Sequence, residues 1–141
     1  MIVAVLDTNT IVSETIAPQG IPSQILQAGR AHQFRWITSI VIIDEVTRAL
    51  SRPRLQRKYR VGPADVDRVR ELLEQHPIVS PITVQVQGIA THPEDDLILA
   101  TAASVQAEYL VTGDQQLQRL GSYQGVQIVS PRQFLDVLSP P

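Results

Sequence analysis

Short apolar runs rich in β-branched residues recur along the chain, and polar or turn-forming residues bound each of them. Such a run indicates a buried strand, because both of its faces are apolar. The β-branched segment after Pro77 contains a further proline, which restricts it to an edge strand or an extended crossing. The predicted strands span residues 2–6, 34–38, 109–111 and 126–129, and residues 78–86 form the edge or crossing segment.

Helical spacing of apolar residues fills most of the sequence between these runs. Thr8 or Asn9 is the expected N-cap of the first helix, and Ser39 is the expected N-cap of a later one. Residues 91–94 have the Ser/Thr-x-x-Glu form of a capping box. Pro53 and the charged stretch to Arg60 are expected to interrupt the helical pattern. The predicted helices span residues 11–16, 22–29 and 40–50, a segment opened by Pro63, a segment from the capping box to residue 105, and residues 115–120 and 131–138.

Strands alternate with helices from one end of the chain to the other. This order predicts an α/β fold, with helices on both faces of a mainly parallel central sheet. The chain has 141 residues, the usual size of one domain, so we expect residues 1–141 to share a single core. In such sheets, ligands bind outside the carboxyl ends of the strands.

Composition excludes several classes of protein. Hydrophobic residues make up 43% of the chain, too many for an intrinsically disordered protein. The chain has no cysteine, which excludes a disulfide scaffold and suits a reducing cytoplasm. No apolar run approaches the ~20 residues needed to span a bilayer, so no membrane association is expected. The net charge of −2 gives no overall attraction to nucleic acid, which would need a local basic patch.

Acidic residues occupy the positions where a site should form. Asp7 follows the first predicted strand directly, and Asp114 follows the third main strand by two residues. Asp95 falls in the first turn of a helix, and Glu45 lies within an otherwise largely apolar helix. Four carboxylates in one pocket would repel one another unless cations neutralised them. Mg²⁺ and Mn²⁺ are the natural partners, and a carboxylate cage with open positions suits hydrolysis of a phosphodiester.

Each acid also has an ordinary structural interpretation. Asp7 could simply cap a helix, and Asp95 could stand at a helix N-terminus because the dipole favours negative charge there. Asp114 follows a glycine, which is typical of a turn, and Glu45 could be a solvated helix residue. The joint placement of two acids at strand ends is the feature that favours a site.

Several motifs together resemble the PIN-domain family, in particular its VapC-like branch of toxins from toxin–antitoxin systems. They are Val5-Leu6-Asp7-Thr8-Asn9, Ser39 with Glu45 six residues later, Pro93-Glu94-Asp95-Asp96-Leu97-Ile98-Leu99-Ala100-Thr101-Ala102 and Tyr109-Leu110-Val111-Thr112-Gly113-Asp114. Residues 52–55 and 126–135 also resemble that branch, so the resemblance extends to about residue 138.

The resemblance implies a three-layer α/β nuclease with a Mg²⁺ or Mn²⁺ centre that cleaves RNA. Such a protein would be the toxin of a type II toxin–antitoxin pair and would be restrained by an antitoxin protein. It could also form a homodimer. The branch commonly has an acid before the proline of the third motif, where this chain has His92. We expect His92 to be a surface or capping residue. The implied metal ligands and catalytic acids are Asp7, Glu45, Asp95 and Asp114, with Asp96 able to share the third role and Asn9, Ser39 and Thr112 as supporting polar residues.

Half of the twelve lysines and arginines fall within thirteen residues, and no acid interrupts them. Such a run is often just a solvated face. Beside an acidic pocket it could instead contact RNA phosphates, with Tyr59 stacking on a base, or it could dock an antitoxin segment. The six residues are Arg48, Arg52, Arg54, Arg57, Lys58 and Arg60.

Other enzyme classes fit less well. A phosphatase of the haloacid dehalogenase type needs a second acid two residues after the first, where this chain has Asn9. A receiver domain needs a late lysine, whereas Lys58 is the only lysine here. With no cysteine and three scattered histidines, no nucleophilic triad is indicated. The remaining alternative is a non-catalytic PIN-like module that binds RNA or protein.

Overall fold

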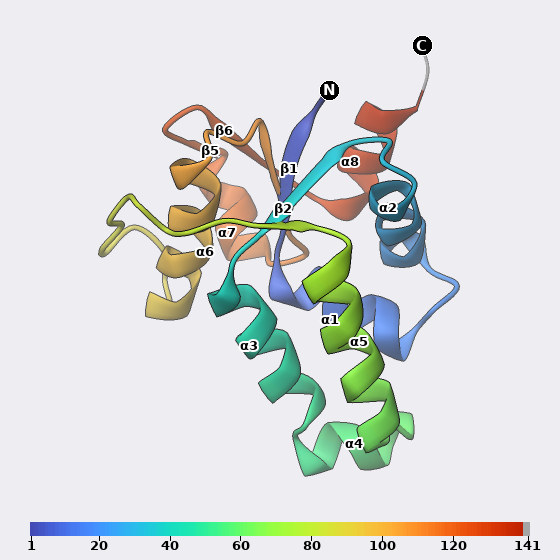
Figure 1. Cartoon of the computed structure of the whole chain (residues 1–141). Helices are drawn as coiled ribbons and strands as arrows, with labels where there is room; N and C mark the ends of the chain where they lie inside the picture. Colours follow the sequence, from blue (N-terminus) through green and yellow to red (C-terminus); the bar gives the residue numbers. More distant parts are fainter. Residues whose placement is uncertain (140–141) are drawn as a thin grey trace.

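The computed structural model describes residues 1–139, which form eight helices and six strands. Figure 1 shows them coloured along the sequence. The strands are β1 (Val3–Leu6), β2 (Arg35–Thr38), β3 (Ile78–Val79), β4 (Tyr109–Val111), β5 (Ser122–Tyr123) and β6 (Val126–Val129). The helices are α1 (Thr8–Ile16), α2 (Ile21–Arg30), α3 (Ile40–Leu50), α4 (Pro53–Tyr59), α5 (Pro63–Gln75), α6 (Pro93–Ser104), α7 (Gln115–Leu120) and α8 (Pro131–Leu138).

The strands form one sheet in the order β3-β2-β1-β4-β6-β5. All neighbouring pairs are parallel except β5 and β6, which confirms the predicted mainly parallel sheet. Leu6 is in register with Val111, and the Asp7 amide donates to the Val111 carbonyl at 2.9 Å. The carboxyl ends of β1 and β4 therefore meet, and Asp7 lies beside Thr112.

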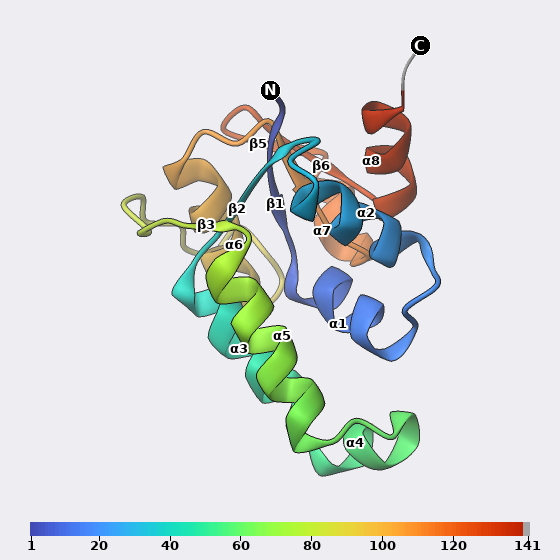
Figure 2. The same cartoon turned by 45° about the vertical axis from the view of Figure 1, so that its right-hand side comes forward.

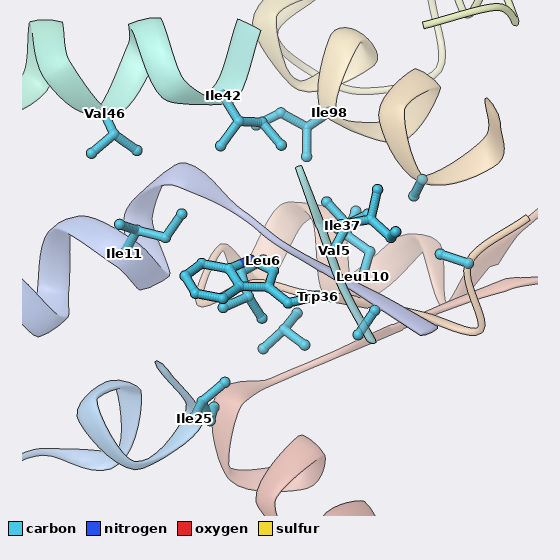
Figure 3. Packing of buried hydrophobic residues seen from close by; sticks show 14 of the residues in the cluster. Val5, Leu6, Ile11, Ile25, Trp36, Ile37, Ile42, Val46, Ile98 and Leu110 are labelled. Carbon is cyan, nitrogen blue, oxygen red and sulfur yellow. The ribbon is translucent and has the colours of Figure 1, made fainter. Parts of the chain in front are cut away.

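Helices cover both faces of the sheet, as the alternation of elements predicts. In Figure 3, Ile42 and Val46 of α3 and Ile98 of α6 lie on one side of the strands, and Ile25 of α2 lies on the other. All four side chains are fully buried. None of the helices in residues 1–139 is long and apolar enough to cross a bilayer.

Helix α3 connects the sheet to the region where the candidate site lies. Ser39 caps it as predicted, accepting a hydrogen bond from the Ile42 amide at 3.5 Å. In two views related by a rotation, α3 and α5 run side by side and α4 joins them at the end away from the sheet (Figure 1, Figure 2). The predicted break before Pro53 is confirmed, because α3 ends at Leu50 and Arg52 is extended. The charged stretch that follows nevertheless forms a helix of its own, since Pro53 occupies the first turn of α4, where its missing N–H costs nothing.

Two further local predictions are corrected. Asp7, rather than Thr8 or Asn9, caps α1, because its carboxylate accepts the Thr8 amide. The capping box at Thr91 is wrong: Pro93 begins α6, which makes His92 the N-cap, and no side chain caps this helix. The prediction of an edge strand after Pro77 is confirmed, because Ile78–Val79 pair with β2 at one edge of the sheet. The two-residue strand β5 was not predicted.

Gly29 of α2 allows this helix to approach two aromatic rings. A Cβ atom at this position would lie 2.9 Å from Cε3 of Trp36 and 3.2 Å from Cζ of Phe34, both of which are buried. We expect Gly29→Ala to lower the free energy of unfolding by roughly 1–2 kcal/mol, because overpacking outweighs the gain in helix propensity. Chemical denaturation measures the change. Gly62→Ala, whose Cβ would meet nothing closer than 3.8 Å, is the control without overpacking. Because Gly62 is the N-cap of α5, where alanine is less favourable than glycine, we expect it to lower stability by less than about 1 kcal/mol.

Candidate active site

Asp7 lies at the centre of the candidate site, at the end of β1, and is only 3% exposed. Each of its carboxylate oxygens accepts one hydrogen bond: Oδ1 from the Thr8 amide at 2.7 Å and Oδ2 from the Thr112 hydroxyl at 2.6 Å. The strand end, the first turn of α1 and the end of β4 thus fix the orientation of this carboxylate.

Three of the predicted acids line one cavity of about 260 Å³. Asp7 comes from the end of β1, Glu45 from the middle of α3 and Asp95 from the first turn of α6. Elements far apart in the sequence therefore bring these carboxylates together, as predicted from their positions. The cavity is completed by Thr8, Asn9, Val12, Ala49, Arg52 and Leu55.

Hydroxyl groups connect the acids to one another. The Thr8 hydroxyl donates to Oε2 of Glu45 at 3.1 Å, so Thr8 binds two carboxylates, that of Asp7 through its amide and that of Glu45 through its hydroxyl. Thr112 donates to Asp7 and accepts from the Asp114 amide at 3.0 Å. Asp114 in turn caps α7, where its Oδ1 accepts the Gln116 amide at 2.8 Å. Asp114 does not line the cavity, but it lies close enough to Asp95 for its negative charge to raise the pKa of Asp95.

Of the predicted supporting residues, Asn9 lies in the acidic cavity and Ser39 lies outside it. Asn9 lines the cavity, and its Oδ1 accepts the Gly113 amide at 3.3 Å, which ties α1 to the loop before Asp114. Ser39 touches none of the acids. It shares a 2.9 Å hydrogen bond with the hydroxyl of Thr101, and so joins the start of α3 to α6.

Asp96 has a different role from its neighbour Asp95. Its buried carboxylate accepts three backbone amides, from Gly88 at 3.0 Å, Ile89 at 3.2 Å and Ala90 at 2.7 Å. These bonds engage both oxygens and fix the loop that precedes α6. The structure therefore brings Asp95, and not Asp96, into the acidic cavity.

Burial and repulsion between the carboxylates raise the pKa values of Asp7 and Asp95. Burial is the main cause that raises the pKa of Asp7 from an ordinary value of 3.8 to about 7. The negative charges of Asp95 and Glu45 raise it further, while the hydrogen bonds from Thr112 and Thr8 oppose the shift. Burial is also the main cause that raises the pKa of Asp95, and the negative charge of Asp114 is the second cause. Such perturbation is typical of functional sites.

This shift predicts how stability depends on pH in the absence of metal. Between about pH 4 and pH 7 the folded protein keeps the Asp7 proton that the unfolded chain has lost, so the free energy of unfolding falls as pH rises. The upper limit of the loss is about 4 kcal/mol, from three pKa units at 1.36 kcal/mol each. Melting temperatures in EDTA should therefore be higher at pH 5 than at pH 8, and Asp7→Asn should flatten the difference. An unchanged pH dependence in the variant would contradict the shift.

The donor set suits a hard divalent cation, although the side chains are not yet arranged around one. Within residues 1–139, no three acidic or histidine side chains are close enough together to hold a metal ion as they stand. The cavity nevertheless presents carboxylate oxygens, which Mg²⁺ and Mn²⁺ prefer, and Asp7 carries an unfavourable buried charge at neutral pH that a cation would neutralise.

The basic stretch runs from the last turn of α3 through α4. Arg52 lines the acidic cavity and is the N-cap of α4, while Lys58 lies 5.3 Å from the ring centroid of half-exposed Tyr59. Among the described residues, none of the six basic side chains forms an ion pair. All of them are exposed, so their charges are available to a ligand.

Two kinds of contact in the site were not predicted from the sequence. Thr8 was interpreted only as a helix cap, yet its hydroxyl orients Glu45. Val12, Ala49 and Leu55 form an apolar wall beside the acids, and nothing in the sequence distinguishes them from core residues. The packing of α1 against α3 brings Val12 and Ala49 to the cavity, and the contact of α4 with α3 brings Leu55 there.

Comparisons with known proteins agree with this fold. The family model described as PIN domain matches residues 3–116. One chain of the crystal structure of VapBC2 from Rickettsia felis, bound to a DNA fragment from their promoter, has a similar fold, with a TM-score of 0.62 and 14% sequence identity. The match covers 92% of this chain and 98% of that chain. No curated protein sequence matches this chain. Since the family model spans well over half of the chain, the protein belongs to the PIN-domain family.

Proposed function

We propose that this protein is a metal-dependent endoribonuclease. The observation that carries the proposal is the convergence of Asp7, Glu45 and Asp95 on one cavity, with Asp114 close to Asp95. Three or four carboxylates gathered without a counter-cation are unfavourable for stability, so their convergence indicates a function that needs them.

These acids would hold Mg²⁺ or Mn²⁺, which when bound supplies an activated water and neutralises charge on the scissile phosphate. The role of the protein is to fix the ligands. Thr112 and the Thr8 amide favour the charged form of Asp7 and orient its oxygens. The Thr8 hydroxyl orients Glu45 through a hydrogen bond to Oε2. Arg52 at the rim provides a positive charge where the phosphate of a bound strand would approach.

Purified protein incubated with single-stranded RNA tests this proposal. We expect internal cleavage with Mg²⁺ or Mn²⁺ and none in EDTA, and activity should return when the metal is restored. Full activity in EDTA would reject the metal-dependent mechanism. Intact RNA under all of these conditions would reject nuclease activity itself.

The exposed basic stretch should contribute most of the non-specific affinity for RNA. Replacing Arg52, Arg54 and Arg57 together with Ala removes three unpaired positive charges beside the acidic cavity. We expect the slope of log K against log salt to become shallower by roughly 2, since each phosphate contact on a single strand contributes about 0.7. Fluorescence anisotropy over a salt series measures the slope. An unchanged slope would show that the stretch is only a solvated face.

We further propose that the protein acts as the toxin of a type II toxin–antitoxin pair. The support is the similar fold of a chain from a VapBC2 structure. An antitoxin would restrain the nuclease by covering the acidic cavity, and the toxin could form a homodimer. Expression of this chain alone should slow bacterial growth, and co-expression of an adjacent small gene should restore it. Normal growth with a protein that still cleaves RNA in vitro would instead indicate a nuclease without a toxin role.

A non-catalytic module that binds RNA or protein is the second candidate. The observation that favours it is that the described side chains do not form a ready-made metal cluster. Calorimetric titration with Mn²⁺ separates the two: a nuclease should bind the ion in the acidic cavity and lose that binding in Asp7→Asn, whereas a non-catalytic module should not bind it.

A further inference from the structure

Asp95 lies between two cavities. On one side it lines the acidic cavity with Asp7 and Glu45. On the other side it lines a second cavity of about 210 Å³, formed by the loop before α6 and by α7. The two cavities therefore share Asp95 as a lining residue, and the second one lies next to the acids.

The second cavity combines apolar walls with unpaired polar groups. Ile89 and Leu120 are exposed by 42% and 37%, and Leu117 forms the buried floor. Gln116 and Arg119 project from α7, and within residues 1–139 neither side chain has a hydrogen bond or ion pair. The remaining lining residues are Ala90, Thr91 and Asp95.

Both walls of this cavity are fixed relative to Asp95. The Asp96 carboxylate binds the amides of Ile89 and Ala90, so the loop wall is held by the residue next to Asp95. Helix α7 is tied to the end of β4, because Gln118 Nε2 donates to the Thr112 carbonyl at 2.8 Å. A ligand would thus meet a preformed pocket and would lose little conformational freedom of the protein on binding.

We infer that this cavity binds the nucleotide adjacent to the cleaved phosphodiester of an RNA strand, a conclusion that rests on the proposed nuclease function. The apolar walls contact the two faces of the base, and the Gln116 amide offers both a donor and an acceptor to its edge. The Arg119 guanidinium binds the next phosphate as a two-pronged donor. Arg52 lies in the acidic cavity and Arg119 in the second one, so a positive charge stands on each side of the acids along one path.

Gln116 and Arg119 are therefore specificity-determining residues, and neither belongs to the acidic centre. The variant Gln116→Ala/Arg119→Ala removes both side-chain contacts but keeps the Gln116 backbone amide that donates to Oδ1 of Asp114. Arg132→Ala is the matched control, because Arg132 is an exposed arginine on α8 with no ion pair in the part of the chain that the structure describes.

The first test compares kcat/KM on three RNA substrates. One carries nucleotides on both sides of the mapped cleavage site. The others are shortened on the 5′ or on the 3′ side to a single abasic ribose, which removes both the adjacent base and the next phosphate on that side. On the long substrate the double variant should lose roughly tenfold in kcat/KM, as expected for one phosphate and one base contact. On the substrate shortened on the side of the second cavity, wild type and variant should be equal, and Arg132→Ala should match wild type throughout. Equal losses on all three substrates, or no loss on the long one, would overturn the inference.

The second test does not depend on catalysis. In EDTA and at low salt, anisotropy of a labelled single-stranded RNA should give a Kd roughly tenfold higher for the double variant than for wild type and Arg132→Ala. An unchanged Kd would overturn the inferred nucleotide subsite. This is also the result expected if the cavity binds a protein partner instead of RNA. If wild type cleaves no RNA but the variant still weakens binding, the nuclease proposal fails while the nucleotide pocket stands.

Discussion

Asp7→Asn is expected to reduce metal-dependent cleavage of RNA on the order of a thousandfold, since several kcal/mol of charge stabilisation are lost at 1.36 kcal/mol per factor of ten. The fold should survive, because an amide fits the same hydrogen bonds. Its oxygen can accept the Thr8 amide, and its NH₂ can donate to the Thr112 hydroxyl, which rotates to accept. In EDTA at pH 8 the melting temperature should stay equal or rise, because a buried charge has been removed.

Cleavage rates with Mn²⁺ and thermal melts in EDTA measure the two effects on the same preparations. Asp67→Asn is the matched control: Asp67 is an exposed acid on α5 outside the cavity, and its variant should match wild type in both assays. Wild-type activity in Asp7→Asn would remove Asp7 from the metal centre. A large fall in melting temperature would mean that the carboxylate serves the fold instead.

The sheet and most helices were predictable because their signals are local. The strands around Asp7 and Thr112 are apolar runs that end at a polar residue, and this pattern is enough to place both residues at one edge of a parallel sheet. Ser39 was predictable as the cap of α3 because the apolar helix follows it directly. The short strand β5 and the helix α4 were not predicted, because two paired residues and a seven-residue helix without a buried side chain leave a weak hydrophobic pattern.

The acids could be identified as candidates from the sequence, whereas the side chains that hydrogen-bond or surround them could not. Nothing local indicates that the Thr8 hydroxyl binds Glu45, because the two residues are 37 positions apart and meet only when α1 packs on α3. The same holds for Arg52, whose place in the acidic cavity depends on the turn between α3 and α4. Asp95 and Asp96 are adjacent acids in the first turn of one helix. The spacing of the family motif favours Asp95 for the third role, but no local signal predicts the three backbone amides that Asp96 accepts.

The largest contrast between neighbouring residues is therefore expected for this pair. Asp95→Asn should abolish cleavage and leave the melting temperature in EDTA equal or higher, because Asp95 lines the cavity and lies near the charge of Asp114. Asp96→Ala should instead lower stability by about 2 kcal/mol, since three backbone amides lose their acceptor and water satisfies them only in part. For a chain of this size, that corresponds to a fall in melting temperature of roughly 5 °C.

Melting curves and cleavage rates, measured well below the melting temperature of each variant, test this contrast. Asp96→Ala should keep cleavage within about tenfold of wild type, because losing a residue that positions a loop costs less than losing a metal ligand. Asp96→Asn provides a graded control: its oxygen can still accept the Ile89 and Ala90 amides, while its NH₂ faces the Gly88 amide. It should therefore lose only about 1 kcal/mol. If Asp96→Asn were stable but inactive and Asp95→Asn were active, the metal-binding role would pass to Asp96, and the loop of residues 88–90 would have to move for the site to form.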